Sequence, residues 1–295
     1  MRILYFTNLK YLKHLSKDIE EALKKLGHNV LTINDQDFKM DELITNANIC
    51  DMFLFHQGGV STDNEYEFRL SLARLHTILQ SIKTKKTLWF IDKVWGSSDL
   101  MMESIVSMVD WAFINDDTWV RRHKYPNVST LHCGVGKKRP LGKFNKELEC
   151  DIAFIGKVYG TRTVFVENLR QQFGRRFKVF QGVHDKEFDD LCQSVKIIVS
   201  PNFPMDDFYW SNRIYKILGC GGFLIHPRLF GLKEEGFIEG KHYVGYKSWN
   251  ELLFHLDHFL KPENHNELNS IAQNGRDFVH KNFNYIKRLK ELLSK

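Results

Sequence analysis

Short runs of apolar residues alternate with longer amphipathic segments along almost the whole chain. The runs at 2–7, 51–56 and 87–92 are nearly continuous, which is typical of strands buried on both faces of a sheet. Between 11 and 27 the apolar residues recur at helical spacing and Gly27 ends the pattern, so we expect a helix there. The same reasoning predicts strands at 28–33, 110–115, 128–134, 150–156, 177–182, 196–201, 223–227 and 242–246, and helices at 65–83, 116–125, 162–174, 185–194, 211–219, 248–261, 265–282 and 283–295.

This alternation of buried strands and helices predicts parallel sheets covered on both faces, an α/β architecture. The segment 135–149 interrupts the alternation with polar, basic, glycine- and proline-containing sequence, as a linker does. We therefore expect two Rossmann-like domains facing a central cleft, at 1–138 and 150–280, and a final helix at 281–295 that packs back on the first domain.

Ligands of such sheets bind beyond the carboxyl ends of the strands. We therefore look for functional residues among those at the end of each strand. These residues are Thr7–Asn8, His56–Gly59, Asp92–Trp95, Asn115–Asp117, Gly156–Arg162, Pro201–Asp207 and His226.

Composition and charge indicate which class of ligand and which cellular compartment to expect. The 295 residues carry a formal net charge of +6, which suits an anionic ligand such as a nucleotide. The five cysteines form no C-x-x-C pair and several lie in apolar runs, so we expect no disulfide framework, no zinc site and a reducing compartment. The start has too short an apolar run for a signal peptide, and no window suits a membrane span, so we expect a cytoplasmic protein.

The stretch "DIAFIGKVYGTR" at 151–162 has a strand, a glycine loop and a helix start. Gly156 and Gly160 let the backbone approach a ligand, and Lys157 and Arg162 add positive charge, so the loop is a candidate phosphate site. Its spacing fits neither G-x-G-x-x-G nor the P-loop, and an ordinary tight turn is the alternative.

The stretch "SNRIYKILGCGGFLIHP" at 211–227 places two basic side chains on the first turns of a helix. Ser211 or Asn212 is a candidate N-cap, and Arg213 and Lys216 share a face that could hold a diphosphate. The glycines that follow let helix, turn and strand pack closely. The alternative is a solvated basic face with a glycine C-cap.

Together these stretches resemble the CgeB-like, spore-maturation-type glycosyltransferases, most specifically in F-I-G-x-x-Y-G-x-R, S-N-R and C-G-[AG]-F-L. The resemblance implies the GT-B fold, a nucleotide-sugar donor, with a UDP-sugar expected, an acceptor on the first domain, and no bound metal or other cofactor. The donor-binding positions it implies are Gly156, Lys157, Tyr159, Arg162, Asn202, Ser211, Asn212, Arg213, Lys216, Gly221 and Gly222.

The chain departs from related glycosyltransferases at two positions. Lys216 stands where they commonly have a glutamate that accepts hydrogen bonds from the donor ribose, and Phe208 stands at the position of an earlier glutamate. A charged lysine can only donate hydrogen bonds, so it would contact phosphate or a differently placed nucleotide.

For inversion of the sugar, the reaction needs a base near the acceptor hydroxyl. Asp92 and His56, each near the end of a strand of the first domain, are the candidates, and a helix cap or a satisfied polar group is the alternative for each. Asp116 and Asp117 are instead expected to cap the next helix.

Basic clusters at 121–124, 137–140 and 174–178 leave two other functions open. A nucleic-acid acceptor is conceivable, which would make the protein a glycosyltransferase of hydroxylated DNA bases, although a solvated basic surface is the alternative. Lys216 and Phe208 would also fit a non-catalytic relative that binds a nucleotide or serves in an assembly.

Overall fold

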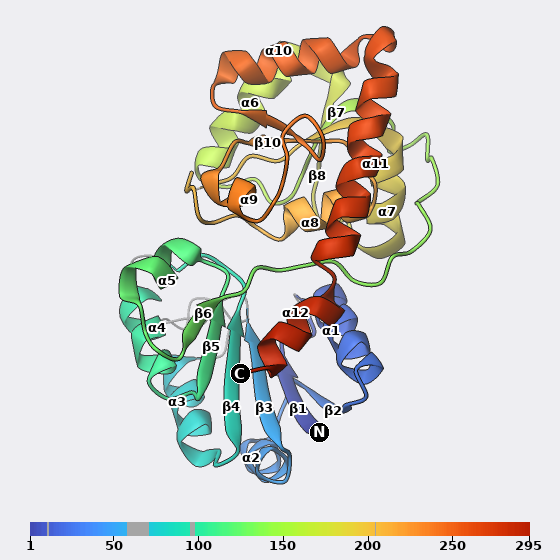
Figure 1. Ribbon diagram of the computed structural model, residues 1–295. Helices are drawn as coiled ribbons and strands as arrows, with labels where there is room; N and C mark the ends of the chain where they lie inside the picture. Colours follow the sequence, from blue (N-terminus) through green and yellow to red (C-terminus); the bar gives the residue numbers. More distant parts are fainter. Residues whose placement is uncertain (11, 58–70, 95–97, 204) are drawn as a thin grey trace. The chain divides into compact units, whose positions relative to one another are not determined.

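The computed structural model describes residues 1–10, 12–57, 71–94, 98–203 and 205–295 (Figure 1). The chain divides into two compact units. Unit 1 comprises Met1–Gly136 and Tyr285–Lys295, and unit 2 comprises Lys137–Asn284. Most of the expected glycine turn at 57–64, the first part of the expected helix at 65–83, and Trp95 lie outside the described residues.

Unit 1 is a parallel sheet with strand order β2-β1-β3-β4-β5-β6 in the described part of the chain. The register pairs Thr7 with both Asn34 and His56, so neighbouring strands end at nearly the same level. Its elements are β1 (Arg2–Thr7), α1 (Lys13–Lys25), β2 (Asn29–Asn34), α2 (Met40–Asn48), β3 (Met52–Gln57), α3 (Leu72–Ser81), β4 (Lys85–Phe90), α4 (Ser98–Val106), β5 (Trp111–Ile114), α5 (Asp117–His123), β6 (Val128–Thr130) and α12 (Tyr285–Leu293).

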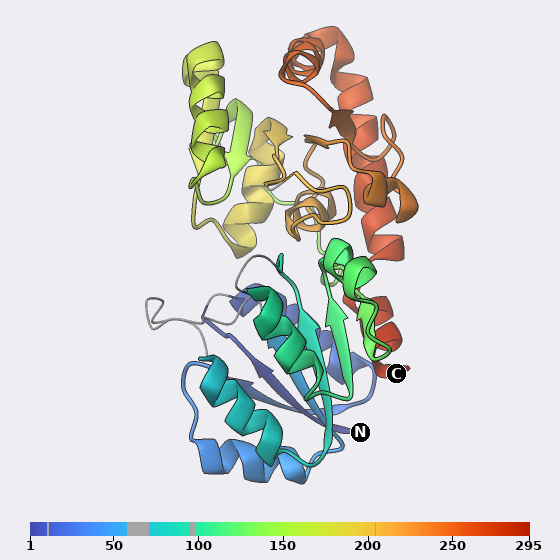
Figure 2. The ribbon, with the colours of Figure 1, turned by 90° about the vertical axis from the view of Figure 1, so that its left-hand side faces the viewer.

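Helices cover both faces of the sheet of unit 1 (Figures 1 and 2). On one face, apolar side chains of α2, α3, α4 and α5 form a single core with Leu4, Phe6, Phe53 and Phe55 of the strands. On the other face lie α1 and the C-terminal helix α12, which pack against each other. The last helix of the sequence is therefore part of the first unit, because its buried side chains complete that unit's second layer.

Unit 2 is a second parallel sheet, with strand order β11-β10-β9-β7-β8. Its core joins the strands to α6 and α10 and to the first half of α11, while α8 packs against α11. Its elements are β7 (Cys150–Ile155), α6 (Thr161–Phe173), η1 (Gly174–Arg176), β8 (Phe177–Phe180), α7 (Asp185–Ser194), β9 (Val195–Val199), α8 (Arg213–Gly219), β10 (Leu224–Pro227), α9 (Phe230–Glu234), β11 (Val244–Tyr246), α10 (Trp249–Leu260), η2 (Pro262–Asn264) and α11 (His265–Asn282).

The polar segment that the sequence suggested as a linker is docked on unit 2. Lys143 N donates to Asp190 Oδ1 at 2.7 Å and Asn145 N donates to Ser194 Oγ at 2.8 Å, both on α7. Gly142 lies so close to the backbone of Asp189 that a Cβ would come within 2.2 Å of it. Polar composition does not distinguish a free linker from an extended segment that binds a helix through its backbone. This segment is of the second kind.

The two parallel sheets covered by helices confirm the α/β expectation. Helices α2, α4 and α9 were not expected from the sequence. Both α2 and α9 are short, and each buries only two residues: Leu43 and Ala47 of α2, and Gly231 and Leu232 of α9. No helix in the described ranges is both long and apolar enough to cross a membrane.

Candidate functional site

Three neighbouring strands of unit 2 end around one guanidinium group, that of Arg213 on α8. Gly156 follows β7, Ser200 follows β9 and His226 lies in β10, and these strands are adjacent in the sheet. Arg213 Nη1 donates to Ser200 Oγ at 3.2 Å. A Cβ on Gly156 would lie 3.0 Å from Arg213 Nη2, and Gly156 has a φ of +145°. Glycine is therefore needed here both for the backbone and for the approach of the guanidinium.

Among the described residues, no acid balances the charge of Arg213. Its guanidinium lies 5.4 Å from the ring centre of Phe154, among the buried residues Ser200 and His226. Burial and the charge of Arg162 lower its pKa to about 10, so the group stays charged at neutral pH. In the described part of the chain no carboxylate pairs with it. A half-buried guanidinium that donates to a serine hydroxyl and lies near a second cation is a site for an anion.

Arg162 supplies that second cation. Its Nη1 donates to Lys157 O at 3.4 Å, and its guanidinium lies 4.6 Å from the ring centre of Tyr159. Its Nε is buried and has no hydrogen-bond partner among the residues that the structure describes. Val158 N donates to Gln181 Oε1 at 3.2 Å, which fixes the loop that carries these residues to the end of β8. Lys157 and Tyr159 are exposed on the same loop as Gly156, and Arg162 lies on the first turn of α6.

The start of α8 differs from the expectation. Asn212 occupies the N-cap position, but it has helical dihedral angles and makes no side-chain capping hydrogen bond. Ser211 precedes it and is half-buried. Lys216 lies one turn after Arg213 and is also half-buried, so α8 carries both basic residues on its first turns.

Three other predicted donor-binding residues have structural positions. Gly221 and Gly222 precede β10 and so lie at the amino edge of the sheet, opposite Arg213. A Cβ would come within 2.7 Å of Leu141 at Gly221 and within 2.8 Å of Ile198 at Gly222. The expected donor contact is therefore corrected: these glycines allow close packing. Asn202 is buried and its Nδ2 donates to Tyr209 O at 2.7 Å, so it holds the loop between β9 and α8.

His226 was noted in the sequence only as a strand end, and the structure places it beside Arg213. It is 2% exposed, and its Nδ1 lies 2.8 Å from its neighbour's carbonyl, Pro227 O. Because a carbonyl can only accept, Nδ1 carries the hydrogen and Nε2 has the lone pair. Burial is the main cause that lowers the pKa of His226 to about 4, and the charge of Arg213 lowers it further.

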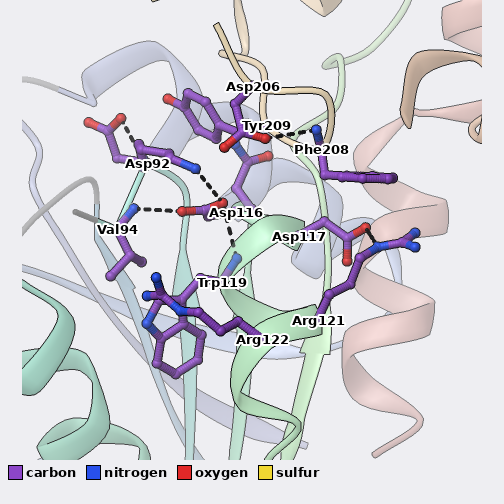
Figure 3. Close-up of polar contacts among 12 residues, drawn as sticks. Asp92, Val94, Asp116, Asp117, Trp119, Arg121, Arg122, Asp206, Phe208 and Tyr209 are labelled. Carbon is purple, nitrogen blue, oxygen red and sulfur yellow. Dashed lines mark hydrogen bonds and ion pairs between the residues drawn. The ribbon is translucent and has the colours of Figure 1, made fainter. Parts of the chain in front are cut away.

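In unit 1, Asp92 lies just beyond the carboxyl end of β4 and is exposed. Its Oδ1 accepts a hydrogen bond from Lys93 N at 2.9 Å (Figure 3). This position leaves the carboxylate accessible at the edge of the sheet where ligands of parallel sheets bind.

His56 does not reach this edge. It is 0% exposed in the middle layer of unit 1, with Nδ1 2.9 Å from Tyr5 Oη and 3.2 Å from Thr7 Oγ1. Its ring packs on Trp89, and burial lowers its pKa to about 3. Its Nε2 is buried and has no hydrogen-bond partner in the described part of the chain. The expectation that His56 faces a ligand is corrected. Phe53 and Phe55 of β3 face the core with α2–α5, so His56 points to the opposite face, where Trp89 contacts both His56 and Tyr285 of α12.

Asp116 caps α5, as the sequence predicted. Its carboxylate accepts from Trp119 N at 3.3 Å and from Val94 N at 3.0 Å, and it pairs with Lys93 Nζ at 2.9 Å (Figure 3). Burial raises its pKa above the usual value. Asp117 pairs with Arg121 at 2.5 Å instead of capping the helix (Figure 3).

The sequence reasoning missed a buried acid at the same edge of unit 1. Asp35 follows β2 directly and is 2% exposed, and it accepts from Gln57 Nε2 at 2.6 Å and from Gln36 Nε2 at 2.9 Å. Burial raises the pKa of Asp35. Its place after a predicted strand, in "TINDQDF", was the signal that could have found it.

The loop that holds Phe208 is folded on itself. Asp206 Oδ1 accepts from Phe208 N at 2.9 Å (Figure 3). The ring of Phe208 meets that of Phe230 edge-on, with 5.7 Å between ring centres. Asp207 Oδ1 accepts from Phe230 N at 3.1 Å. The two aspartates next to Phe208 therefore shape the loop through backbone hydrogen bonds.

A family model described as glycosyl transferase-like matches residues 146–294, which include the Gly156 loop, α8 and the strand ends around Arg213. The chain belongs to this glycosyltransferase family. No curated protein matches the sequence. Groups of three or more His, Cys, Asp or Glu that could hold a metal are absent from the part of this glycosyltransferase that the structure describes.

Solved structures of glycosyltransferases share the fold over the whole chain. An alpha-glucosyltransferase in complex with UDP-glucose and DNA containing an abasic site has a TM-score of 0.71 at 10% identity and covers 100% of this chain and 98% of its own. HepE from Anabaena, in complex with UDP and glucose, has a TM-score of 0.64 at 11% identity, with the same coverage of 100% and 98%. Sucrose-phosphate synthase from Thermosynechococcus elongatus has a TM-score of 0.65 at 12% identity, also with 100% and 98%. These likenesses establish the GT-B fold of the glycosyltransferase.

Proposed function

We propose that this protein is a CgeB-like glycosyltransferase that transfers a sugar from a UDP-sugar to an acceptor hydroxyl. The observation that carries the proposal is the guanidinium of Arg213, which lies at three strand ends, contacts Ser200 and approaches Gly156, and has no acid to balance it in the described chain. Membership of the glycosyltransferase family and the UDP and UDP-glucose bound by proteins of the same fold support the choice of donor.

The diphosphate of the donor would bind between Arg213 and the loop 156–162. Arg213 would contact phosphate oxygens with the N–H groups that Ser200 leaves unused, and Arg162 and Lys157 would add charge from the other side. During transfer the bond from the sugar C1 to the diphosphate oxygen breaks, and negative charge grows on that oxygen. Cations already fixed there stabilise this charge, so we propose that the reaction needs no bound metal.

The departure at Lys216 bears on how both the ribose and the diphosphate of the donor are held. Its position one turn after Arg213 on α8 supports a contact of its ammonium with a phosphate oxygen, in place of the ribose contact that a glutamate makes. We therefore propose that the donor ribose is held elsewhere in this protein.

We propose Asp92 as the general base of an inverting transfer. Its carboxylate is exposed just beyond β4 and would take the proton from the acceptor hydroxyl while the acceptor oxygen bonds to C1. His56 does not compete for this role because it is fully buried and its pKa is lowered to about 3.

The basic clusters do not favour DNA as the acceptor. In the cluster at 121–124, Arg121 pairs with Asp117 and Arg122 pairs with Asp99. Lys138 pairs with Asp277, and Arg176 pairs with Asp151. Cations already paired with carboxylates contribute less to phosphate binding than free ones, so we leave the acceptor as a hydroxyl compound of unassigned class.

The donor proposal is tested by thermal shift with UDP, UDP-glucose, UDP-galactose, UDP-N-acetylglucosamine, ADP-glucose and GDP-mannose. We expect the uridine compounds to raise the melting temperature of the wild type and not of Arg213→Ala. Arg170→Ala is the matched control, because Arg170 is an exposed arginine on α6 that pairs with Glu167. No shift with any nucleotide would overturn the donor site, and binding without transfer to water or to any acceptor would favour the non-catalytic alternative.

A further inference from the structure

His226 lies next to the proposed diphosphate site, but the function proposed above gives it no role. It is 2% exposed in β10, one strand away from Ser200, which follows β9 and contacts Arg213. The hydrogen on its Nδ1 is engaged with Pro227 O at 2.8 Å. Any further proton must therefore bind Nε2.

The surroundings of His226 contain few charges that could stabilise an imidazolium. From α8, the charge of Arg213 acts against a second positive charge. From the segment before β11, Tyr243 presents its ring edge-on at 6.4 Å, and burial raises the pKa of Tyr243 to about 12, so that phenol is neutral. On the chain after Pro227, Arg228 is paired with Glu239 at 2.5 Å and with Glu251 at 2.8 Å. His226 is therefore neutral in the unliganded protein.

We propose that His226 takes up a proton when the pyrophosphate of the donor binds at Arg213, which makes donor binding stronger at lower pH. The proposal rests on the proposed donor site. The pyrophosphate of a nucleotide sugar carries two negative charges. When it binds at Arg213, its negative charge offsets the positive charge of Arg213, which opposes an imidazolium at His226. The negative charge also attracts an imidazolium directly, and both effects favour protonation of Nε2.

The direction of the pH dependence follows from linkage. A histidine that binds its proton more tightly in the complex than in the free protein makes the affinity rise as the pH falls through its pKa in the complex. One proton gives at most about a tenfold gain in affinity per pH unit. The gain ends near pH 4, because below the pKa of about 4 the free protein is protonated as well.

The experiment is isothermal titration of UDP-glucose at pH 5.5 and 7.5, each in two buffers of different ionisation enthalpy. UDP-glucose is the probe because its pyrophosphate diester does not titrate in this range, whereas the terminal phosphate of UDP does. We expect the wild type to take up a fraction of a proton on binding, more at pH 5.5 than at pH 7.5. We expect His226→Gln to take up none and to bind with an affinity that does not change between the two pH values.

His242→Gln is the matched control. His242 is also buried, and burial lowers its pKa to about 4, but its ring stacks on Phe278 at 4.0 Å and it has no interaction with Arg213. This variant should keep the proton uptake of the wild type. UDP-glucose binding with equal proton uptake in the wild type and His226→Gln would overturn the role of His226 and leave the donor site standing. Failure of the folded wild type to bind UDP-glucose at either pH would overturn the donor site itself, and the role of His226 with it.

Discussion

Arg213 Nη1 lies 3.2 Å from Ser200 Oγ, and this hydrogen bond fixes a guanidinium from a helix to the end of a strand. Ser200 is itself held, since its N–H donates to Ile225 O at 3.0 Å in the next strand. The guanidinium is therefore already positioned before a ligand binds. Binding of a diphosphate then costs less conformational entropy, because the long side chain is ordered beforehand.

Arg213→Lys keeps the positive charge but loses the fork of N–H donors, and we expect it to weaken UDP binding. Hydrogen bonds to charged groups contribute about 1.5–3 kcal/mol each, so the loss should be about 10- to 100-fold in Kd. Ser200→Ala should have a smaller effect, because it removes only the group that orients Arg213. Titration calorimetry measures both, and equal Kd values for the wild type and the lysine variant would contradict the role of the fork.

Gly156→Ala should weaken UDP binding because the new Cβ would lie 3.0 Å from Arg213 Nη2 and displace the guanidinium. The φ of +145° adds backbone strain of about 1–3 kcal/mol. Gly182→Ala separates the two effects. Gly182 has a φ of +70°, but a Cβ there would meet nothing within 4 Å. Both variants should lose stability in thermal unfolding, and only Gly156→Ala should lose UDP affinity.

Asp92→Asn should lower kcat by about 10²- to 10⁴-fold and leave the affinity for UDP-glucose unchanged, because a general base acts on the acceptor and not on the donor. Asp110→Asn is the control: Asp110 is exposed in the same unit but precedes β5, so it lies at the opposite edge of the sheet. Steady-state kinetics with the acceptor found by screening gives the answer. A kcat within a few-fold of wild type for Asp92→Asn would favour a retaining mechanism.

The buried histidines predict acid sensitivity of the fold. Burial lowers the pKa of His56 and of His132 to about 3, whereas an unfolded histidine has a pKa of 6.5. Between these values the unfolded chain binds more protons than the folded one, so stability is present above pH 6.5 and is lost as the pH falls toward 3.

His56→Gln tests this sign. Between pH 4 and 6, we expect the variant to take up about one proton fewer on unfolding than the wild type does. The unfolding free energy should therefore depend less steeply on pH, by up to about 1.4 kcal/mol per pH unit. Urea unfolding at several pH values measures the slope. His76→Gln serves as the control, because His76 is part-buried on α3 and bonds Ser104 at 3.0 Å near the surface. An unchanged slope in His56→Gln would mean that His56 is protonated in the folded state.

The sequence by itself determined the class of fold and the first half of the candidate site. Continuous apolar runs between helices indicate sheets buried on both faces, and a glycine loop directly after a strand keeps its basic residues close together. Gly156, Lys157, Tyr159 and Arg162 are neighbours in the chain, so their proximity needed no tertiary information.

Only the tertiary structure decided which distant residues join them. Ser200 and His226 meet Arg213 because β9, β10 and β7 are adjacent in the sheet, an order that hydrophobic pattern does not encode. The same order sends Gly221 and Gly222 to the opposite edge, although they follow Arg213 closely in sequence. His56 and Asp92 both lie near strand ends, but one side chain faces the layer under α1 and α12 and the other faces solvent. Whether a polar residue at a strand end is buried depends on where the strand stops and on which helix covers that face, and both are set by packing between distant segments.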